Sequence, residues 1–431
     1  MITVLAATIF LVTYAFIATE KIHRVAAALG GAAGMTVIGL VDAESAFFDH
    51  DTGIDWNVIF LLFGMMVIVS VLKQTGLFEA LALWAARASR GDPRRLLTML
   101  ILVTGGLSPV LDNVTTVLLV APVALSVTAR FGVSSTPYLI AMVCASNIGG
   151  MGTLIGDPPN IIIGSRADIS FNDFLIHAMP ITVILLAGLV VLCQLLFRRQ
   201  LVGTLTGGGD LDDLRPGEAI PDRRRLYVCL GLLALVMVAF GLHTIVHIDP
   251  SVIAMLGAGA LVVATGSTPE MFLEEVEWET LVFFMGLFVL VGALVEIGVI
   301  GDLGRAAADL LGDQELVASA VLLFGSAIAG GFVDNIPYTA ATVPIVTELV
   351  AATPSSGADS PLWWAFTFGA DLGGNTTAVA AGANVVVIGI AHKHGRPISF
   401  WEFTRVGLVV TFASLAVAFL YVWLRYFVIG G

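Results

Sequence analysis

Carboxylate and amide side chains recur where glycine or proline interrupts two long apolar stretches, and these side chains are the best suited to bind an ion. Side-chain oxygens of this kind are ligands that hard cations prefer, and a carboxylate can also carry a proton. The alternative is that each aspartate only caps the following helix and each asparagine only bonds neighbouring helices. The candidate residues are Asp112, Asn113, Thr115, Asp334, Asn335 and Thr339.

A second pair of interruptions combines polar residues with glycine pairs. The pairs at 149–150 and 373–374 can unwind a helix, and Pro158 and Pro159 prevent its simple continuation. The resulting half-helices expose N–H groups at one end and carbonyl groups at the other, which suit anions and Na⁺ respectively. The candidate residues are Asn147, Gly149, Thr153, Asp157, Asn160, Asp371, Gly373, Asn375, Thr377 and Asn384.

Four aspartates, Asp112, Asp157, Asp334 and Asp371, are therefore predicted to lie at membrane depth. An unpaired carboxylate at the bilayer centre costs at least ~2.5 kcal/mol, and the four interruptions contain no Lys or Arg that could neutralise it. Each carboxylate must be protonated, coordinate a cation or accept hydrogen bonds from unwound backbone. The sequence therefore predicts that this set binds protons or cations.

The composition places these residues in a membrane protein. Hydrophobic residues make up 58% of the 431 residues and charged residues 12%, about half the charged fraction of a soluble domain. The net charge of -13 argues against a nucleic-acid partner, which requires a basic face. Three scattered cysteines form no metal or disulfide pattern. Since no catalytic constellation is visible, we expect neither an enzyme nor a bound cofactor.

Apolar runs predict an all-α polytopic fold. Two further stretches, 95–130 and 317–350, are too long for one crossing and are predicted to form re-entrant hairpins with polar tips. Residues 77–89 and 299–311 are predicted to form short interfacial helices. The crossing segments are predicted at 2–18, 25–41, 57–73, 137–165, 178–198, 226–243, 251–267, 279–297, 362–391 and 402–428.

An internal repeat organises the chain. Trp56, Asp112 and Pro122 recur 222 positions later, and Gly149 and Asn160 recur 224 positions later. Each unit has five crossings and one hairpin, so the second unit is predicted to be inverted. The units span 1–199 and 226–431, joined by a cytoplasmic linker at 200–225. We expect scaffold helices in 2–73 and 226–297, and transport elements in 95–199 and 317–428.

The basic residues predict the orientation in the membrane. With this topology, all of the 20 Lys and Arg residues except Arg166, Arg305 and Arg425 fall on one side. Because basic residues concentrate on the cytoplasmic side, the chain is predicted to be a multi-pass protein of the plasma (inner) membrane with both termini outside.

The motifs resemble those of the ion transporter superfamily. Residues 147–150 and 155–160 are similar to the arsenite-permease and P-protein branch, and residues 112–116 are also similar to NhaD-type Na⁺/H⁺ antiporters. The resemblance implies a homodimer with a scaffold and a transport domain in each protomer, moving by an elevator mechanism. It also implies Na⁺ sites at Asp112, Asn113, Asn147, Gly149, Asp334, Asn335, Asp371 and Gly373.

These expectations define one main function and two alternatives. The main hypothesis is an H⁺- or Na⁺-coupled secondary transporter of the arsenite or Na⁺/H⁺ antiporter type, acting on a small inorganic ion or small anion. The first alternative is a Na⁺-coupled symporter of dicarboxylate, phosphate or sulfate, although the Ser-Asn-Thr tips of the dicarboxylate branch are replaced here by Asp-Asn-Val-Thr and Asp-Asn-Ile-Pro. The second is a channel, which would require a continuous polar pore.

Overall fold

The computed structural model describes residues 2–19, 21–49, 52–201, 215–311 and 314–429. Within these ranges the chain is helical and contains no strand. Nine of the described helices are long and apolar enough to cross a membrane, and α13 (Pro250–Thr265) is a shorter apolar helix. The prediction of an all-α polytopic membrane protein is therefore confirmed.

The first part of the chain forms eleven helices within the described residues. They are α1 (Ile2–Thr19), α2 (Arg24–Val37), α3 (Ala43–Phe47), α4 (Trp56–Lys73), α5 (Leu77–Ala88), α6 (Pro93–Leu111), α7 (Asn113–Arg130), α8 (Thr136–Gly150), α9 (Pro158–Ala167), α10 (Phe171–His177) and α11 (Met179–Leu196). Part of the predicted linker, 202–214, lies outside the described residues.

The second part has a similar order of helix lengths. After η2 (Pro216–Ala219) come α12 (Arg223–Val246), α13, α14 (Pro269–Leu273), α15 (Trp278–Glu296), α16 (Val299–Leu311), α17 (Glu315–Phe332), α18 (Asn335–Ala351), η3 (Gly357–Asp359), α19 (Pro361–Gly373), α20 (Gly382–Lys393), α21 (Phe400–Val422) and η4, a π-helix (Trp423–Ile429). The inverted relation of the two parts stays a prediction.

Helix breaks occur where the polar motifs predicted them. The long stretches 137–165 and 362–391 are each divided into two helices, with non-helical residues at 151–157 and 374–381. The stretch 95–130 is divided at Asp112, where α6 meets α7 and the two helices pack together. The stretch 317–350 is divided in the same way between α17 and α18.

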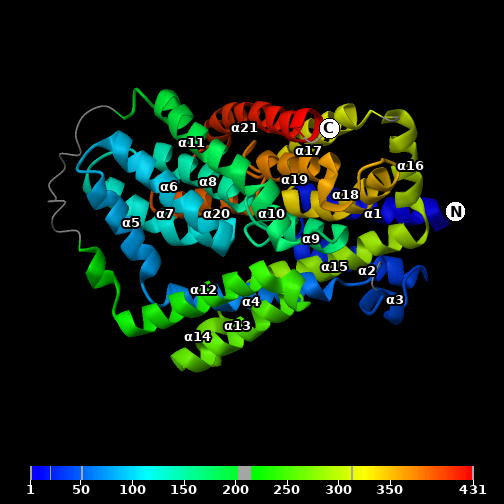
Figure 1. Cartoon of the computed structure of the whole chain (residues 1–431), viewed down its shortest axis with the longest axis horizontal. Coiled ribbons are helices and arrows are strands. Elements are labelled where there is room, and N and C mark those ends of the chain that lie inside the picture. The colour runs from blue at the N-terminus through cyan, green and yellow to red at the C-terminus, as the bar shows by residue number, and fades with distance from the viewer. Residues whose placement is uncertain (1, 20, 50–51, 202–214, 312–313, 430–431) are drawn as a thin grey trace.

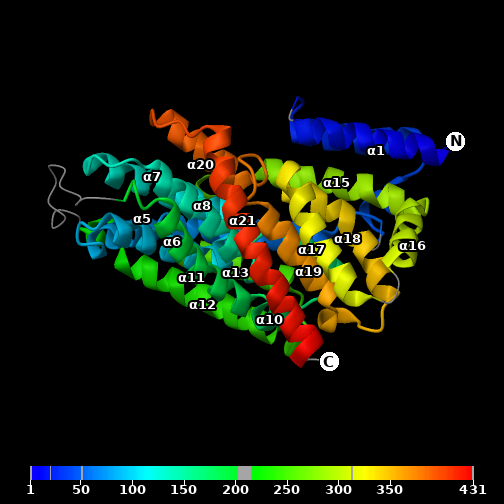
Figure 2. The same ribbon diagram turned by 90° about the horizontal axis from the view of Figure 1, so that it is seen from above.

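The helices pack in two groups, visible as two layers in Figure 1. In one group α4 packs against α13 and α2 against α15; in the other α6 packs against α8 and α17 against α19. The short helices α5 and α16 lie at opposite ends of the molecule in both Figure 1 and Figure 2. The candidate residues lie on the second group, which faces α4 and α15 of the first. The assignment of these groups as transport and scaffold domains stays a prediction.

Gly64 of α4 and Gly286 of α15 allow close backbone contacts between helices of the first group. A Cβ atom added at Gly64 would lie 2.7 Å from the carbonyl carbon of Ala254, and one added at Gly286 would lie 3.0 Å from that of Ala28. Small residues let helix backbones approach in this way, which gains van der Waals contact in a lipid environment. Glycine at these two positions therefore fixes the α4–α13 and α2–α15 contacts.

We predict that Gly64→Val lowers the stability of the protein by about 1–3 kcal/mol, because the added atoms must push α13 away from α4. Gly259→Val is the matched control: it is also in a helix interior, but no atom lies within 4 Å of its added Cβ. Thermal unfolding in detergent should show a lower midpoint for the first variant alone. Equal midpoints would contradict the proposed packing.

Candidate functional site

Amide side chains from both parts of the chain meet in one buried network. The Asn113 Nδ2 group donates to Asn147 Oδ1 at 3.2 Å and to Asp157 Oδ2 at 2.8 Å. Asn147 Nδ2 in turn donates to Asn375 Oδ1 at 3.0 Å and to Asn384 Oδ1 at 3.2 Å. We call this network with its buried neighbours the polar core; it consists of Asn113, Asn147, Asp157, Asn160, Asn335, Asp371, Asn375 and Asn384, all at most 3% exposed.

The two helix breaks are held by the same hydrogen bonds. Asn160 Nδ2 donates to the carbonyl oxygens of Gly150 and Thr153, at 3.2 and 3.0 Å. Asn384 Nδ2 donates to the carbonyl oxygens of Gly374 and Thr377, at 2.7 Å each. Carbonyl groups freed by a helix break must be satisfied inside the protein at membrane depth. The amide groups of Asn160 and Asn384 therefore have a structural role at the breaks.

A threonine within each break ties it to a hairpin. Thr153 donates its hydroxyl proton to the carbonyl of Pro109 in α6, and Thr377 donates to that of Gly331 in α17. The predicted carbonyl ligands Gly149 and Gly373 already accept from the backbone N–H groups three residues on, those of Gly152 and Thr376.

The hairpin-tip aspartates are helix caps. Asp112, which has a positive φ of 89°, accepts from the Thr115 backbone N–H at 2.7 Å and from its hydroxyl at 2.8 Å. Asp334 accepts from the Ile336 N–H at 3.1 Å. Each is the N-cap residue of the helix that follows, α7 or α18. Helix capping, which the sequence left open as an alternative role, is therefore observed for both residues.

The other two aspartates have unsatisfied oxygens. Within the described part of the chain, Asp157 Oδ1 and both carboxylate oxygens of Asp371 have no hydrogen-bond partner, and neither do Asn113 Oδ1 and Asn160 Oδ1. Asp157 also interacts electrostatically with Asp371 and with both tip aspartates. Each such buried oxygen costs about 1–3 kcal/mol if nothing binds it.

The chemistry of this donor set fits a proton or a small hard cation. Five unsatisfied acceptor oxygens lie in the polar core, and all are carboxylate or amide oxygens, the ligand type that hard cations take. The described residues contain no group of three or more His, Cys, Asp or Glu side chains placed to hold a metal ion. Amide oxygens of Asn113 and Asn160 would therefore have to complete a cation site at Asp157 and Asp371.

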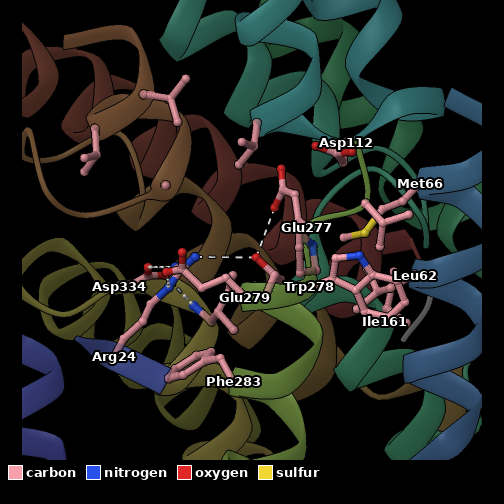
Figure 3. Close-up of a pocket in the computed structure, with 18 of the residues that line it drawn as sticks. Arg24, Leu62, Met66, Asp112, Ile161, Glu277, Trp278, Glu279, Phe283 and Asp334 are labelled. Carbon is pink, nitrogen blue, oxygen red and sulfur yellow. Dashed lines mark hydrogen bonds and ion pairs between the residues drawn. The ribbon is translucent and has the colours of Figure 1, made fainter. Parts of the chain in front are cut away.

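A cavity of about 750 Å³ lies beside the polar core, and we call it the tip cavity because Asp112 and Asp334 both line it. Figure 3 shows Glu277, Glu279 and Arg24 among its polar residues, with Leu62 and Phe283 among its apolar ones. The first turns of four helices, α7, α9, α18 and α20, also line it.

Arg24 corrects one expectation drawn from the sequence. No basic residue lies within the four interruptions, but the Nη1 atom of Arg24 lies 3.7 Å from Asp334 Oδ2. The sequence also gave no reason to select Glu277 and Glu279. These residues lie at helix N-termini far from the motifs in the chain, and only the packing of α2 and α15 brings them to the hairpin tip.

A second cavity of about 740 Å³ adjoins the first. Along α4 it contacts Leu61, whereas the tip cavity contacts Leu62; Ile161 of α9 lines both. In the loop before α9, the neighbouring residues Leu154 and Ile155 likewise line different cavities: Leu154 lines the second cavity and Ile155 the tip cavity. All five of these side chains are buried, so a narrow apolar barrier separates the two cavities.

We predict that Asp371→Asn and Asn384→Leu affect stability differently. The first removes a buried charge, and the amide of the same size keeps an acceptor oxygen facing Asn160, so the thermal midpoint in detergent should stay the same or rise. The second orphans the carbonyls of Gly374 and Thr377 and should cost about 2–5 kcal/mol. A loss of stability in Asp371→Asn as large as that in Asn384→Leu would show that the carboxylate is structural.

Comparisons with known proteins agree with this architecture. An uncharacterised transporter of Mycobacterium tuberculosis is 51% identical over 432 residues, covering 99% of each chain. A 46 kDa membrane protein of Mycobacterium leprae is 50% identical over 99% of this chain and 100% of its own. The human P protein is 32% identical over 99% of this chain, which spans 60% of that protein.

Solved structures share the fold at low identity. The YdaH transporter of Alcanivorax borkumensis has a TM-score of 0.62 at 14% identity, covering 85% of both chains. MtrF of Neisseria gonorrhoeae, whose structure illuminates a class of antimetabolite efflux pumps, has a TM-score of 0.61 at 13% identity, covering 86% of this chain and 81% of its own.

A family model described as a citrate transporter matches residues 14–369, most of the chain. Together with the full-length relatives, this match confirms the resemblance that the motifs indicated. The chain is therefore a multi-pass membrane protein of the citrate transporter family, within the ion transporter superfamily.

Proposed function

We propose that this transporter is a secondary active carrier driven by H⁺ or Na⁺, with the coupling ion bound in the polar core at Asp157 and Asp371. The observation that carries the proposal is the group of buried carboxylate and amide oxygens without hydrogen-bond partners. A proton or a Na⁺ ion would satisfy these oxygens and neutralise the repulsion between the two carboxylates. Competition between the two ions for one site would couple their movements.

The tip cavity supports a cation or a neutral oxyacid as the substrate. Four carboxylates line it, those of Asp112, Glu277, Glu279 and Asp334, and Arg24 is already paired with the last two. A polyanion would be repelled by this charge unless cations entered with it. We therefore favour a Na⁺/H⁺ antiporter or an arsenite-type permease over a citrate carrier.

A Na⁺-coupled anion symporter is the second candidate, and one observation favours it. The N-terminal turns of α7, α9, α18 and α20 converge on the tip cavity. The free N–H groups at helix N-termini bind anions. Na⁺ in the polar core could offset the aspartates and admit a dicarboxylate, phosphate or sulfate.

The two cavities support alternating access rather than a channel. They are similar in volume and meet at the apolar barrier of Leu61, Leu62, Leu154, Ile155 and Ile161. We propose that the tip cavity opens to the cytoplasm and that the hairpin group moves as an elevator against α4 and α15. A homodimer in the inner membrane, with both protomers' termini outside, completes the proposal.

We predict that Asp157→Asn and Asp371→Asn each reduce coupled flux in proteoliposomes at least about tenfold, because neither amide can exchange a proton or balance a cation's charge. Asp302→Asn is the matched control, since Asp302 is an exposed residue of α16 paired with Arg305. Unchanged elution in size-exclusion chromatography would show that the variants fold. Wild-type flux in both variants would refute the assignment.

A flux panel should separate the candidate substrates. Wild-type proteoliposomes would be given Na⁺, arsenite, phosphate or citrate, each with and without a pH gradient. An antiporter or arsenite permease predicts saturable flux of Na⁺ or arsenite that responds to the gradient. Na⁺-dependent uptake of phosphate or citrate would favour the symporter instead, and unsaturating conductance would favour a channel.

A further inference from the structure

Arg24 connects the two groups of helices at the tip cavity. Its Nε atom lies 3.0 Å from Glu279 Oε1 and its Nη2 atom 3.4 Å from the Thr280 hydroxyl, both on α15. Its Nη1 atom lies 3.7 Å from Asp334 Oδ2 at the tip of the second hairpin. The guanidinium also stands over the Phe283 ring, 5.5 Å from the ring centroid. Figure 3 shows this one side chain between Asp334 and Glu279.

A second contact holds the same hairpin. The hydroxyl of Tyr14 in α1 donates a hydrogen bond to the carbonyl of Pro337 in the first turn of α18. The tip of the first hairpin has different surroundings, because Asp112 faces Glu277, and the two carboxylates repel each other. The second hairpin tip is thus attached to α1, α2 and α15, whereas the first meets a like charge across the cavity.

We propose that Arg24 is a positioning residue that locks the second hairpin in the conformation seen here. In this role the guanidinium competes with the transported cation for Asp334. A cation that entered the tip cavity and neutralised Asp334 would weaken the hold of Arg24 on the hairpin. Glu279 would then keep the guanidinium on α15 while the hairpin moved. The competition rests on the proposed function, but the lock itself requires only the ion pair.

The strength of the contact suits a lock that opens in every cycle. The side chains of Arg24 and Asp334 are 31% and 22% exposed, and ion pairs with such access to water are weak. Loss of one pair of this kind would shift a two-state equilibrium by about two- to fivefold.

Alkylation of single cysteines tests the lock without any transported ion. On a background in which the three buried native cysteines are replaced by alanine, the probe sites are Val385→Cys in the tip cavity and Thr244→Cys in the second cavity. We expect Arg24→Gln to slow maleimide labelling at Val385→Cys by about two- to fivefold, because the hairpin leaves the present conformation more often. Labelling at Thr244→Cys should not slow.

Two control variants make the labelling result decisive. Arg24→Lys keeps the charge and should restore much of the wild-type rate. Arg305→Gln removes an exposed ion pair on α16 and should change neither probe. Faster labelling at both probes would indicate unfolding rather than an opened lock, and unchanged labelling in Arg24→Gln would likewise overturn the proposal.

Flux measurements test the competition through effects of opposite sign. Arg24→Gln should lower the half-saturating Na⁺ concentration about two- to fivefold, because the Arg24 guanidinium no longer competes with Na⁺ for Asp334. Glu279→Gln should raise it, because Arg24 then loses one of its two ion-pair partners and interacts more strongly with Asp334. Shifts in the same direction would overturn the competition. If wild-type flux shows no dependence on Na⁺ or H⁺, the proposed function fails, while the labelling result still decides whether the lock exists.

Discussion

Every polar backbone group that a helix break releases inside an apolar environment must find a partner within the protein. Here the breaks at 151–157 and 374–381 release carbonyl groups at the centre of the molecule. Asn160 and Asn384 satisfy them with one amide group each. Because these amides must reach back across the break, they fix the positions of α9 and α20 relative to the helices before them, and the polar core forms where these ends meet.

The same constraint separates the four aspartates by role. Asp112 and Asp334 each use one carboxylate oxygen to accept from an N–H group of the helix that follows. The other oxygen contacts the Thr115 hydroxyl in Asp112 and Arg24 in Asp334. Asp157 precedes α9 but its side chain caps no N–H group there, since Pro158 and Pro159 have none to donate, and Asp371 lies near the end of α19. Three of the four carboxylate oxygens of these two residues have no hydrogen-bond partner within the described residues. Since the capped carboxylates line the tip cavity and the unsatisfied ones lie behind it, an ion entering that cavity would meet Asp112 or Asp334 first.

Close packing determines where the cavities can form. Gly64 and Gly286 bring α4 to α13 and α2 to α15 with no room for a side chain between them, so these pairs make compact surfaces. The hairpin group contacts those surfaces less extensively, through α4 with α9 and α15 with α18. Both cavities lie along this looser boundary, which is where relative movement of two groups would break the fewest contacts.

The sequence by itself determined the class of the protein, the helix breaks and the identity of the polar-core residues. It could do so because apolar length, glycine pairs and prolines act locally, within a few turns of one helix. It could not assign roles among the aspartates, since capping and ion binding use the same side chain and differ only in what lies opposite. Nor could it bring Arg24 and Glu279 to Asp334, because their contact joins segments separated by more than fifty residues and depends on how α2 packs against α15. Tertiary structure alone decided which charges face each other.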